Sequence, residues 1–536
     1  YSKLNAYCLN GYALCSIPCR AIIICDPKLL NHAFLKDYQK DYVIRFAHKK
    51  EFYSLLHKTF QHLGSSKAKH YLDFISKSMT AKNVPYIRII YCISIVFGML
   101  FLYCISALNL IHNVFYFAQN IFKTILFCSA KYQQTAEFKS MQDVDSYPVY
   151  TILLPLYKES KNVAPLIEHL LKIEYPKSKL DIKLIVEEGD NLTIKAIQTL
   201  TLSSCFHLIK VPYSTPLTKP KAMNYALEYA IGEYLVIYDA EDRPELDQLT
   251  KVATKFASAS SLEVCIQAKL NYYNRDENIL TKLFSIEYSI WFDFFLKGLD
   301  TRALPIPLGG TSNHFITKVL KELGAWDAYN VTEDADLGTR LYLSGHRVSI
   351  IDSYTFEESP ITIEAWMGQR ARWIKGYIQT FLVYLRQRKE GRRNDLSIGI
   401  TIWLFIGLVT YSFLLLPWLI AGTLLCESSF LHAMFIINSI FSLSYMYATA
   451  FIVLKENKKK VSNFTVQDIT ALILWPLYFL CHTVAAYKAL YELLTEPFTW
   501  NKTEHGVSEY VNISAGGVPK GTEKRTTHTS DEDIKF

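Results

Sequence analysis

The chain alternates between long apolar runs and a central region in which the apolar runs are short. Ile89 to Phe122, Ile398 to Cys426 and Ser428 to Leu454 contain no Asp, Glu, Lys or Arg. Because a helix needs about 20 mostly apolar residues to cross a bilayer, the second and third runs predict single transmembrane spans. The first run is too long for one straight crossing and predicts a transmembrane hairpin over 86–130. The pattern therefore predicts an integral membrane protein.

The region 147–360 has the pattern of a soluble α/β domain. Short apolar runs predict strands, and amphipathic stretches at 162–173 and 221–232 predict helices between them. Strands that alternate with helices form βαβ units and a parallel sheet, and such sheets bind ligands at the carboxyl ends of their strands. The predicted strands are VYTILLPLY (149–157), DIKLIVEEGD (181–190), HLIKVPY (207–213), EYLVIYDAED (233–242) and EVCIQAKLNYY (263–273).

The flanking segments have patterns of their own. Residues 1–80 predict a mixed N-terminal domain, and 361–395 predict an amphipathic helix at the membrane interface. Residues 397–494 predict C-terminal transmembrane and interfacial helices. The segment 495–536 predicts a loop followed by a polar, disordered tail.

The last apolar segment, 466–494, is interpreted as an interfacial or re-entrant helix. It contains Asp468, Pro476 and His482. A full crossing would place the residues after 494 on the opposite side of the bilayer from the basic cluster that precedes 466. An interfacial helix keeps both of its ends on one side.

Charge adds a topology to this picture. The net charge is +7, and basic residues gather on both flanks of 398–454, which places these flanks and the α/β domain in the cytosol. We therefore expect a multi-pass protein of the inner (cytoplasmic) membrane that contacts anionic lipids. No nucleic-acid-binding module is recognisable, so no nucleic-acid partner is expected. The basic residues are Arg370, Arg372, Lys375, Arg386, Arg388, Lys389, Arg392, Arg393, Lys455, Lys458, Lys459 and Lys460.

Three acids follow the fourth predicted strand within YDAEDRPE. Asp239 and Glu241 are two residues apart, and Asp242 comes next. Closely spaced carboxylates repel one another unless a cation lies between them. A hard divalent ion that bridges to a diphosphate, Mg²⁺ or Mn²⁺, would fit. A solvated acidic turn would give the same pattern.

Two further stretches suit a nucleotide ligand. LTKPKAMNYAL carries Lys219 and Lys221 just before a helix, where ammonium groups and helix amides together favour an anion. Lysines also occupy such surface positions without any ligand. LIVEEGD ends in Glu187 and Glu188, whose carboxylates can accept hydrogen bonds from a nucleobase or a ribose.

Seven motifs over roughly 148–376 resemble, in their order, the processive enzymes of glycosyltransferase family 2, which are cellulose-synthase-like and hyaluronan-synthase-like membrane proteins. The resemblance implies a GT-A-like, nucleotide-sugar-binding α/β domain inserted between transmembrane helices. It implies an inverting transfer of sugar, with UDP-glucose the first choice of donor, to a growing β-linked polysaccharide. The motifs are TILLPLYKES, LIVEEGD, KPKAMNYAL, YDAEDRPE, LGGTSNHF, TEDADLGTRL and QRARW.

The resemblance assigns roles to the donor side of the site. Asp239 and Glu241 would form the DxD element that holds the metal, although Glu stands in the second place with Asp242 beside it. Glu187 or Glu188 would replace the usual aspartates near the uridine. The nucleotide-sugar-binding set is Glu187, Glu188, Lys219, Asp239, Trp500 and Lys502, of which the last two would belong to a gating loop within EPFTWNKTEHG.

The resemblance also assigns the acceptor side. Asp334 of the TED motif would remove the proton from the acceptor hydroxyl. Gln369, Arg372 and Trp373 would form the QxxRW element; these positions share one helix face, so the cation can stabilise the departing diphosphate and the indole can stack on the acceptor sugar. Gly310, Thr311, Ser312 and Trp373 would contact the acceptor.

Several alternatives stay open. The donor could be UDP-GlcNAc or GDP-mannose, and the transfer could be non-processive, to a lipid. The chain could instead be a non-catalytic membrane scaffold that binds a nucleotide sugar. Residues 1–60, with GYALCSIPCR and DPKLLNHAFL, loosely resemble the N-terminal domain of type II secretion ATPases. No phosphate-binding loop follows, so we assign no ATPase activity, and a regulatory or partner-docking role is a hypothesis. Accessory subunits are an open question.

Overall fold

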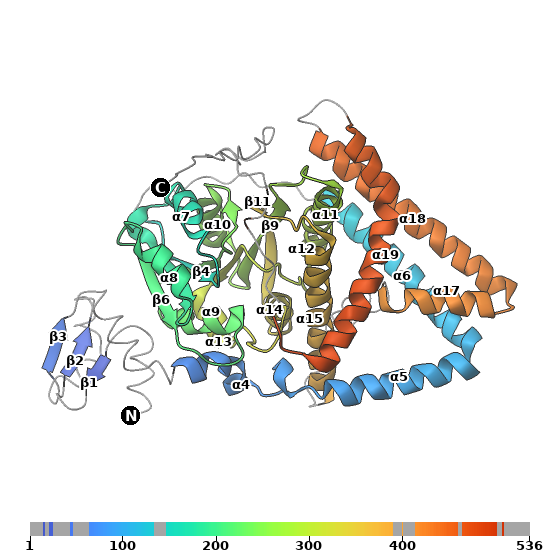
Figure 1. The fold of residues 1–536 in the computed structure, drawn as a ribbon, viewed down its shortest axis with the longest axis horizontal. Helices are drawn as coiled ribbons and strands as arrows, with labels where there is room; N and C mark the ends of the chain where they lie inside the picture. The colour runs from blue at the N-terminus through green and yellow to red at the C-terminus, as the bar shows by residue number, and fades with distance from the viewer. Residues whose placement is uncertain are drawn as a thin grey trace, which may run out of the picture.

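A mixed sheet of eight strands forms the centre of the α/β domain (Figure 1). This computed structural model describes residues 14–16, 21–24, 43–46, 64–132, 146–389, 399, 413–458, 464–500, 506 and 508. The strand order is β6-β5-β4-β7-β10-β9-β11-β8. The strands are β4 (Tyr150–Leu156), β5 (Leu180–Glu187), β6 (Phe206–Val211), β7 (Tyr234–Ile237), β8 (Arg243–Pro244), β9 (Glu263–Tyr272), β10 (Asn313–Ile316) and β11 (Arg347–Glu357).

The sheet is not wholly parallel, so that part of the sequence prediction is wrong. Strands β6, β5, β4 and β7 run parallel, as do β9 and β11. Strand β10 lies between the two groups and runs antiparallel to both β7 and β9, and β8 pairs antiparallel with β11. The sequence concealed β10 because its four residues NHFI have no long apolar run, unlike the central parallel strands.

Alternating side chains of the strands pack on opposite faces of the sheet, as the strand repeat requires. Ile152 and Leu154 belong to a buried cluster with α7 (Val163–Leu171), α8 (Asn191–Gln198) and α10 (Gln248–Ser258). Leu153 faces the other way, toward α9 (Lys219–Leu227). Both faces are therefore covered, which explains why these strands read as continuous apolar runs.

A second group of helices follows strands β9, β10 and β11 along the chain. They are α11 (Ile279–Ser289), a π-helix (Ile290–Phe295), α12 (Leu296–Thr301), α13 (Thr317–Glu322), α14 (Glu333–Leu343) and α15 (Ile363–Lys389). The chain also forms a separate small sheet, in which β2 (Ala21–Ile24) pairs with β1 (Leu14–Ser16) and β3 (Val43–Phe46).

The apolar helices lie to one side of the α/β domain (Figure 1). Helices α5 (Tyr86–Tyr103) and α6 (Ile105–Tyr132) meet at Cys104, and α17 (Leu416–Leu425), α18 (Ser429–Lys458) and α19 (Val466–Thr495) follow. Three described helices are long and apolar enough to cross a membrane: α5, most of α18, and α19. Of the predicted 398–426 span, only 399 and 413–426 lie within the described residues.

Helix α19 touches the α/β domain through polar groups along its length. Asp468 in its first turn pairs with Lys282 of α11 at 2.8 Å. Near its other end, Glu492 pairs with Lys375 of α15 at 3.2 Å. A helix that crossed the bilayer would hold one end about 30 Å of hydrocarbon away from the other. Because both ends of α19 bind the same domain, the helix runs along that domain.

Candidate active site

One cavity of about 360 Å³ lies at the carboxyl ends of β4, β5, β7 and β11. Eleven of the predicted site residues line it: Glu187, Lys219, Asp239, Glu241, Gly310, Thr311, Asp334, Gln369, Arg372, Trp373 and Trp500. Glu188 is exposed and Ser312 is buried, and neither lines the cavity. Lys502 lies outside the described residues.

Lys219 and Asp239 form the polar floor of the cavity. Lys219 is the first residue of α9, and its Nζ lies 2.6 and 2.8 Å from the two carboxylate oxygens of Asp239. The same ammonium donates to the carbonyl of Gly310 at 2.7 Å. Burial alone would lower the pKa of Lys219, but Asp239, Glu333 and Asp334 outweigh it and raise the pKa above the ordinary value. The lysine is therefore a fixed cation where phosphates would lie.

The two acids that follow Asp239 occupy different environments. Glu241 lines the cavity, and burial together with the charge of Asp239 raises its pKa to about 8. Asp242 is fully buried below the cavity, where it accepts hydrogen bonds from the backbone N–H of Asp239, at 2.7 Å, and from the Thr311 hydroxyl. The sequence alone could not separate these carboxylates. The geometry points Glu241 toward a ligand and gives Asp242 a supporting position.

A divalent cation suits this donor set. Mg²⁺ is usually held by one or two carboxylates together with substrate phosphates, and Asp239 and Glu241 supply two carboxylates on one cavity wall. Burial raises the pKa of Glu241 first and the charge of Asp239 raises it further, and a bound cation would offset both effects. Within the described parts of the chain, no group of three or more His, Cys, Asp or Glu side chains could hold a metal by itself. A metal here would therefore need further ligands, such as water or substrate phosphates.

Asp334 lies in the first turn of α14, beside the glycine-rich loop. Its Oδ1 accepts a hydrogen bond from the N–H of Ala335 at 2.8 Å, and a Cβ added at Gly310 would lie 3.4 Å from its Oδ2. Burial raises the pKa of Asp334, while Lys219 and Arg372 act in the opposite direction. A carboxylate so placed can accept a proton from a hydroxyl in the cavity.

Helix α15 brings the predicted QxxRW residues to the opposite wall. Arg372 lies with its guanidinium carbon 5.2 Å from the ring centroid of Trp500. Trp373 stacks on Tyr288 with ring centroids 6.0 Å apart. Gln369 Oε1 is buried and accepts no hydrogen bond from any residue that the structure describes. Gln369, Arg372 and the indole of Trp373 thus line the same cavity as Asp334.

Glycine lets α15 approach the residue that precedes α14. A Cβ at Gly376 would lie 2.2 Å from the side-chain oxygen of Thr332, the residue that precedes α14. Glycine is therefore required for this contact.

Several functional neighbours were missed by the sequence analysis. Arg370 was counted with the basic flank, but its guanidinium carbon lies 4.3 Å from the ring of Phe284 and 4.6 Å from that of Trp373, and it pairs with Glu287. The pKa of Glu287, which burial would raise, is lowered to about 2 by Arg370 and His482. This cluster fixes the indole of Trp373. No spacing signal connects α11 to α15, so only the fold could reveal it.

The lining of the cavity becomes mostly aromatic toward the apolar helices. Its far half is lined by rings from the π-helix and from the segments after α15, together with Lys123 of α6; the rings are Trp291, Phe292, Phe295, Phe413, Tyr445, Phe479 and His482. Charged groups therefore gather at one end of the cavity and aromatic rings at the other.

The family match agrees with the resemblance that the sequence motifs indicated. Residues 234–484 match the family described as "Glycosyl transferase family group 2". This match covers just under half of the chain and supports a glycosyltransferase domain of the family 2 type. A probable glycosyltransferase of Bacillus subtilis (strain 168), YdaM, is 22% identical over 273 residues, which cover 50% of this chain and 64% of the relative. The match thus spans less than two thirds of the relative's length.

Solved structures that align with this chain include a mannosyltransferase and a protein in complex with UDP-GlcNAc. The mannosyltransferase PcManGT from Pyrobaculum calidifontis, in complex with GDP-Man and Mn²⁺, aligns with a TM-score of 0.46 and 17% identity over 72% of this chain and 99% of its own. TarS 1–349 of S. aureus, in complex with UDP-GlcNAc, aligns with a TM-score of 0.36 and 12% identity over 67% of this chain and 97% of its own.

Proposed function

We propose that the protein transfers a sugar from a nucleotide sugar to an acceptor by a single inverting displacement. The observation that carries this proposal is the meeting, in one cavity of a glycosyltransferase family 2 domain, of the Lys219–Asp239 pair with Asp334 and Arg372. A binding scaffold needs a cation for the diphosphate but no carboxylate placed, like that of Asp334, beside the glycine-rich loop that contains Gly310. A catalytic function therefore explains the presence of Asp334 in the cavity, which a binding scaffold would not require.

The donor would lie along the wall from β5 to β7. Glu187 Oε1 pairs with Lys221 at 2.7 Å, while among the described residues no donor reaches the buried Glu187 Oε2. An N–H of a nucleobase would satisfy that oxygen. Lys219 would then face the diphosphate, beside Asp239 and Glu241, which would hold Mg²⁺ or Mn²⁺. The metal, when bound, neutralises charge that develops on the leaving diphosphate.

The reaction follows from the positions of Asp334 and Arg372. The acceptor hydroxyl gives its proton to Asp334 as its oxygen forms a bond to the anomeric carbon. The bond from that carbon to the phosphate oxygen breaks, and the nucleoside diphosphate leaves with the electron pair. Lys219 and Arg372 stabilise the charge that it gains. One displacement inverts the anomeric centre, so an α-linked donor gives a β-linkage.

The acceptor would enter from the aromatic half of the cavity. Trp373, Tyr288 and Trp291 offer flat apolar surfaces on which sugar rings can stack. Their continuity with α18 and α19 supports a growing polysaccharide that passes toward the membrane, with UDP-glucose as the donor to test first. A lipid acceptor would use the same opening, and the donor could then be UDP-GlcNAc or GDP-mannose.

The membrane arrangement is part of this proposal. We infer that α5, the 398–426 segment and α18 anchor the protein in the cytoplasmic membrane, with the glycosyltransferase domain in the cytosol. We infer that α19 lies at the interface, because both of its ends bind the domain and its outer face exposes Ile473, Leu477 and Leu480.

Radiolabelled donors test the proposal and separate the acceptors. Membranes that contain the protein are supplied with UDP-glucose, UDP-GlcNAc or GDP-mannose and with Mg²⁺ or Mn²⁺. Label retained in an ethanol-insoluble fraction supports a polysaccharide, and label extracted into chloroform–methanol supports a lipid acceptor. Binding of the nucleotide with no release of diphosphate from any donor contradicts transfer and favours the scaffold.

A further inference from the structure

The loop 325–332 connects the elements that carry the proposed site residues. At its start, Asn224 of α9 exchanges two hydrogen bonds with the backbone of Trp326, at 2.7 and 3.1 Å. Further along, the hydroxyl of Thr218, which precedes Lys219, donates to the carbonyl of Ala328 at 2.9 Å. The loop is therefore bound to the helix that presents Lys219, and it leads directly into Asp334.

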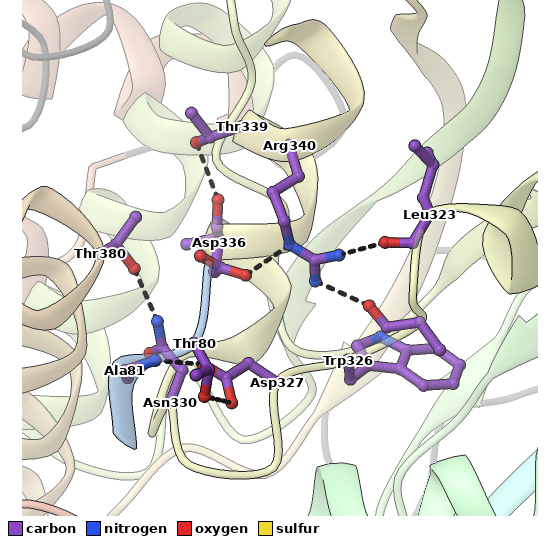
Figure 2. Close-up of polar contacts among 12 residues, drawn as sticks. Thr80, Ala81, Leu323, Trp326, Asp327, Asn330, Asp336, Thr339, Arg340 and Thr380 are labelled. Atoms are coloured by element: carbon purple, nitrogen blue, oxygen red, sulfur yellow. Dashed lines mark hydrogen bonds and ion pairs between the residues drawn. The ribbon is translucent and has the colours of Figure 1, made fainter. Parts of the chain in front are cut away.

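The same loop is bound to α15. Asn330 donates to the hydroxyl of Thr380 at 3.0 Å, and the N–H of Val331 donates to Gln379 Oε1 at 3.1 Å. Figure 2 shows the Asn330–Thr380 contact beside the Asp336–Arg340 pair of α14. The helices that carry Lys219, Asp334 and Arg372 thus all adjoin this one loop.

The last partner of the loop 325–332 comes from outside the sheet domain. The linker 76–85 joins α4 (Tyr71–Ile75) to the apolar helix α5. Within it, the hydroxyl of Thr80 and the N–H of Ala81 both donate to the carboxylate of Asp327, at 3.0 and 2.6 Å (Figure 2). Thr80, Ala81 and Asp327 are all nearly inaccessible to solvent, at 1%, 0% and 2% exposure.

Helix α15 holds the linker from its other side. Arg386 donates to the carbonyls of Ser78 and Thr80, the latter at 2.9 Å. Lys82 also lies over the ring of Tyr329, with its Nζ 5.1 Å from the centroid. The segment that leads into the first apolar helix is therefore clamped between α15 and the loop that precedes the base.

We propose that Thr80 and Asp327 are positioning residues, through which the linker before α5 fixes the loop 325–332 and hence the orientation of Asp334. The inference rests on the proposed sugar transfer. It gives the membrane-proximal linker a part in turnover, since a displacement of α5 would reach the base through two buried hydrogen bonds. Small errors in the placement of a reacting group are costly, at about 100-fold in rate for 1 Å.

The test compares variants of the full-length protein in lipid nanodiscs. Thr80→Val removes the hydroxyl and keeps the shape, and Thr80→Ser restores the hydroxyl. We expect Thr80→Val to lower kcat about tenfold, with donor KM and Thr80→Ser activity within about twofold of the original. We also expect faster hydrogen–deuterium exchange at 325–334 in Thr80→Val than in Thr80→Ser.

A matched control separates positioning from stability. Asp300 is 2% exposed and, like Asp327, accepts a hydrogen bond from a backbone N–H, that of Ile350 at 3.0 Å. It does not line the cavity. Asp300→Asn should lower the melting temperature as Asp327→Asn does, while kcat falls only in Asp327→Asn.

Two results would overturn the inference. One is unchanged kcat and unchanged exchange at 325–334 in Thr80→Val. The other is an equal loss of kcat in Asp300→Asn and Asp327→Asn. If Asp327→Asn does not fold, the comparison of Thr80→Val with Thr80→Ser tests the inference by itself. A protein without turnover refutes the proposed function instead, and the exchange measurement still judges the positioning role.

Discussion

At the scale of single residues, neighbouring side chains of the same type take different positions. Asp239, Glu241 and Asp242 follow one another within four positions, yet Lys219 pairs with the first, the cavity exposes the second, and Thr311 binds the third. The sequence predicted a metal site from their spacing. Which carboxylate faces the ligand depends on how the chain turns after β7, and no local pattern encodes that turn.

This difference predicts opposite effects of two substitutions. Glu241→Gln removes a carboxylate from the cavity, so the concentration of Mn²⁺ that gives half-maximal turnover should rise about tenfold. Asp242→Asn should leave that concentration nearly unchanged and lower the melting temperature, because its carboxylate holds Asp239 and Thr311 in place. A metal titration and a thermal melt of both variants test this assignment. A larger metal effect in Asp242→Asn would contradict the assignment.

The electrostatics of the base predict a pH dependence. Asp334 must be deprotonated to accept a proton, and burial raises its pKa. Turnover should therefore increase with pH through a value above the ordinary range of an aspartate.

The charge of Arg372 acts against burial and lowers the pKa of Asp334. Arg372→Met should thus move the acid limb of the kcat/KM profile to higher pH, and Arg372→Lys should leave it near its original position. An acid limb that is the same in both variants would show that Asp334 is not the titrating group.

At the scale of elements, the site depends on the close approach of α15 to α14. Two glycines of α15 offer a matched pair. A Cβ at Gly376 would meet Thr332, whereas a Cβ at Gly368 would meet nothing within 4 Å.

We predict that Gly368→Ala stabilises the protein by roughly 1 kcal/mol through helix propensity. Gly376→Ala should destabilise it by about 1–3 kcal/mol through overpacking and should also lower kcat, because Asp334 follows Thr332 closely. Chemical denaturation and UDP release measure the two effects. Equal free energies of unfolding of the two variants would mean that α14 and α15 can move apart without a loss of stability.

Local patterns predicted the elements better than their pairing. The five predicted strands begin within one residue of β4, β5, β6, β7 and β9, because continuous apolar runs mark strands that are buried on both faces. The predicted ends of β5 and β7 lie three and five residues too far along the chain, where acidic residues follow the strands. Strand β10 was not predicted, because its four residues beside a glycine-rich loop form too short an apolar run. Its antiparallel direction depends on the helices that precede it. The Arg370–Glu287 pair escaped for a similar reason, since it joins two helices far apart in the chain.

At the scale of the whole molecule, the catalytic cavity is shared between the α/β domain and the apolar helices. Lys123, Tyr445 and Phe479 line its far half. A sequence can reveal apolar length, but it cannot show that these side chains close the same space as Asp334. The composite cavity is why we place the acceptor on the membrane side.

The arrangement of α19 predicts a labelling pattern. In a variant without other cysteines, Val466→Cys and Thr495→Cys mark the two ends of the helix, at residues that are both exposed. If α19 lies at the interface, a membrane-impermeant maleimide should label both from the cytosolic side of inverted vesicles. Labelling of one end in inverted vesicles and the other in right-side-out vesicles would show that α19 crosses the membrane.

The measurement that tests the central claim most directly compares Asp334→Asn with the unaltered protein. Release of diphosphate and binding of the nucleotide sugar are measured on the same preparations with Mn²⁺. A general base contributes about 100- to 10,000-fold, so we predict that release falls by at least about 100-fold while nucleotide affinity stays within about twofold. Undiminished release, or loss of binding in step with release, would contradict the role of Asp334 and with it the proposed inverting transfer.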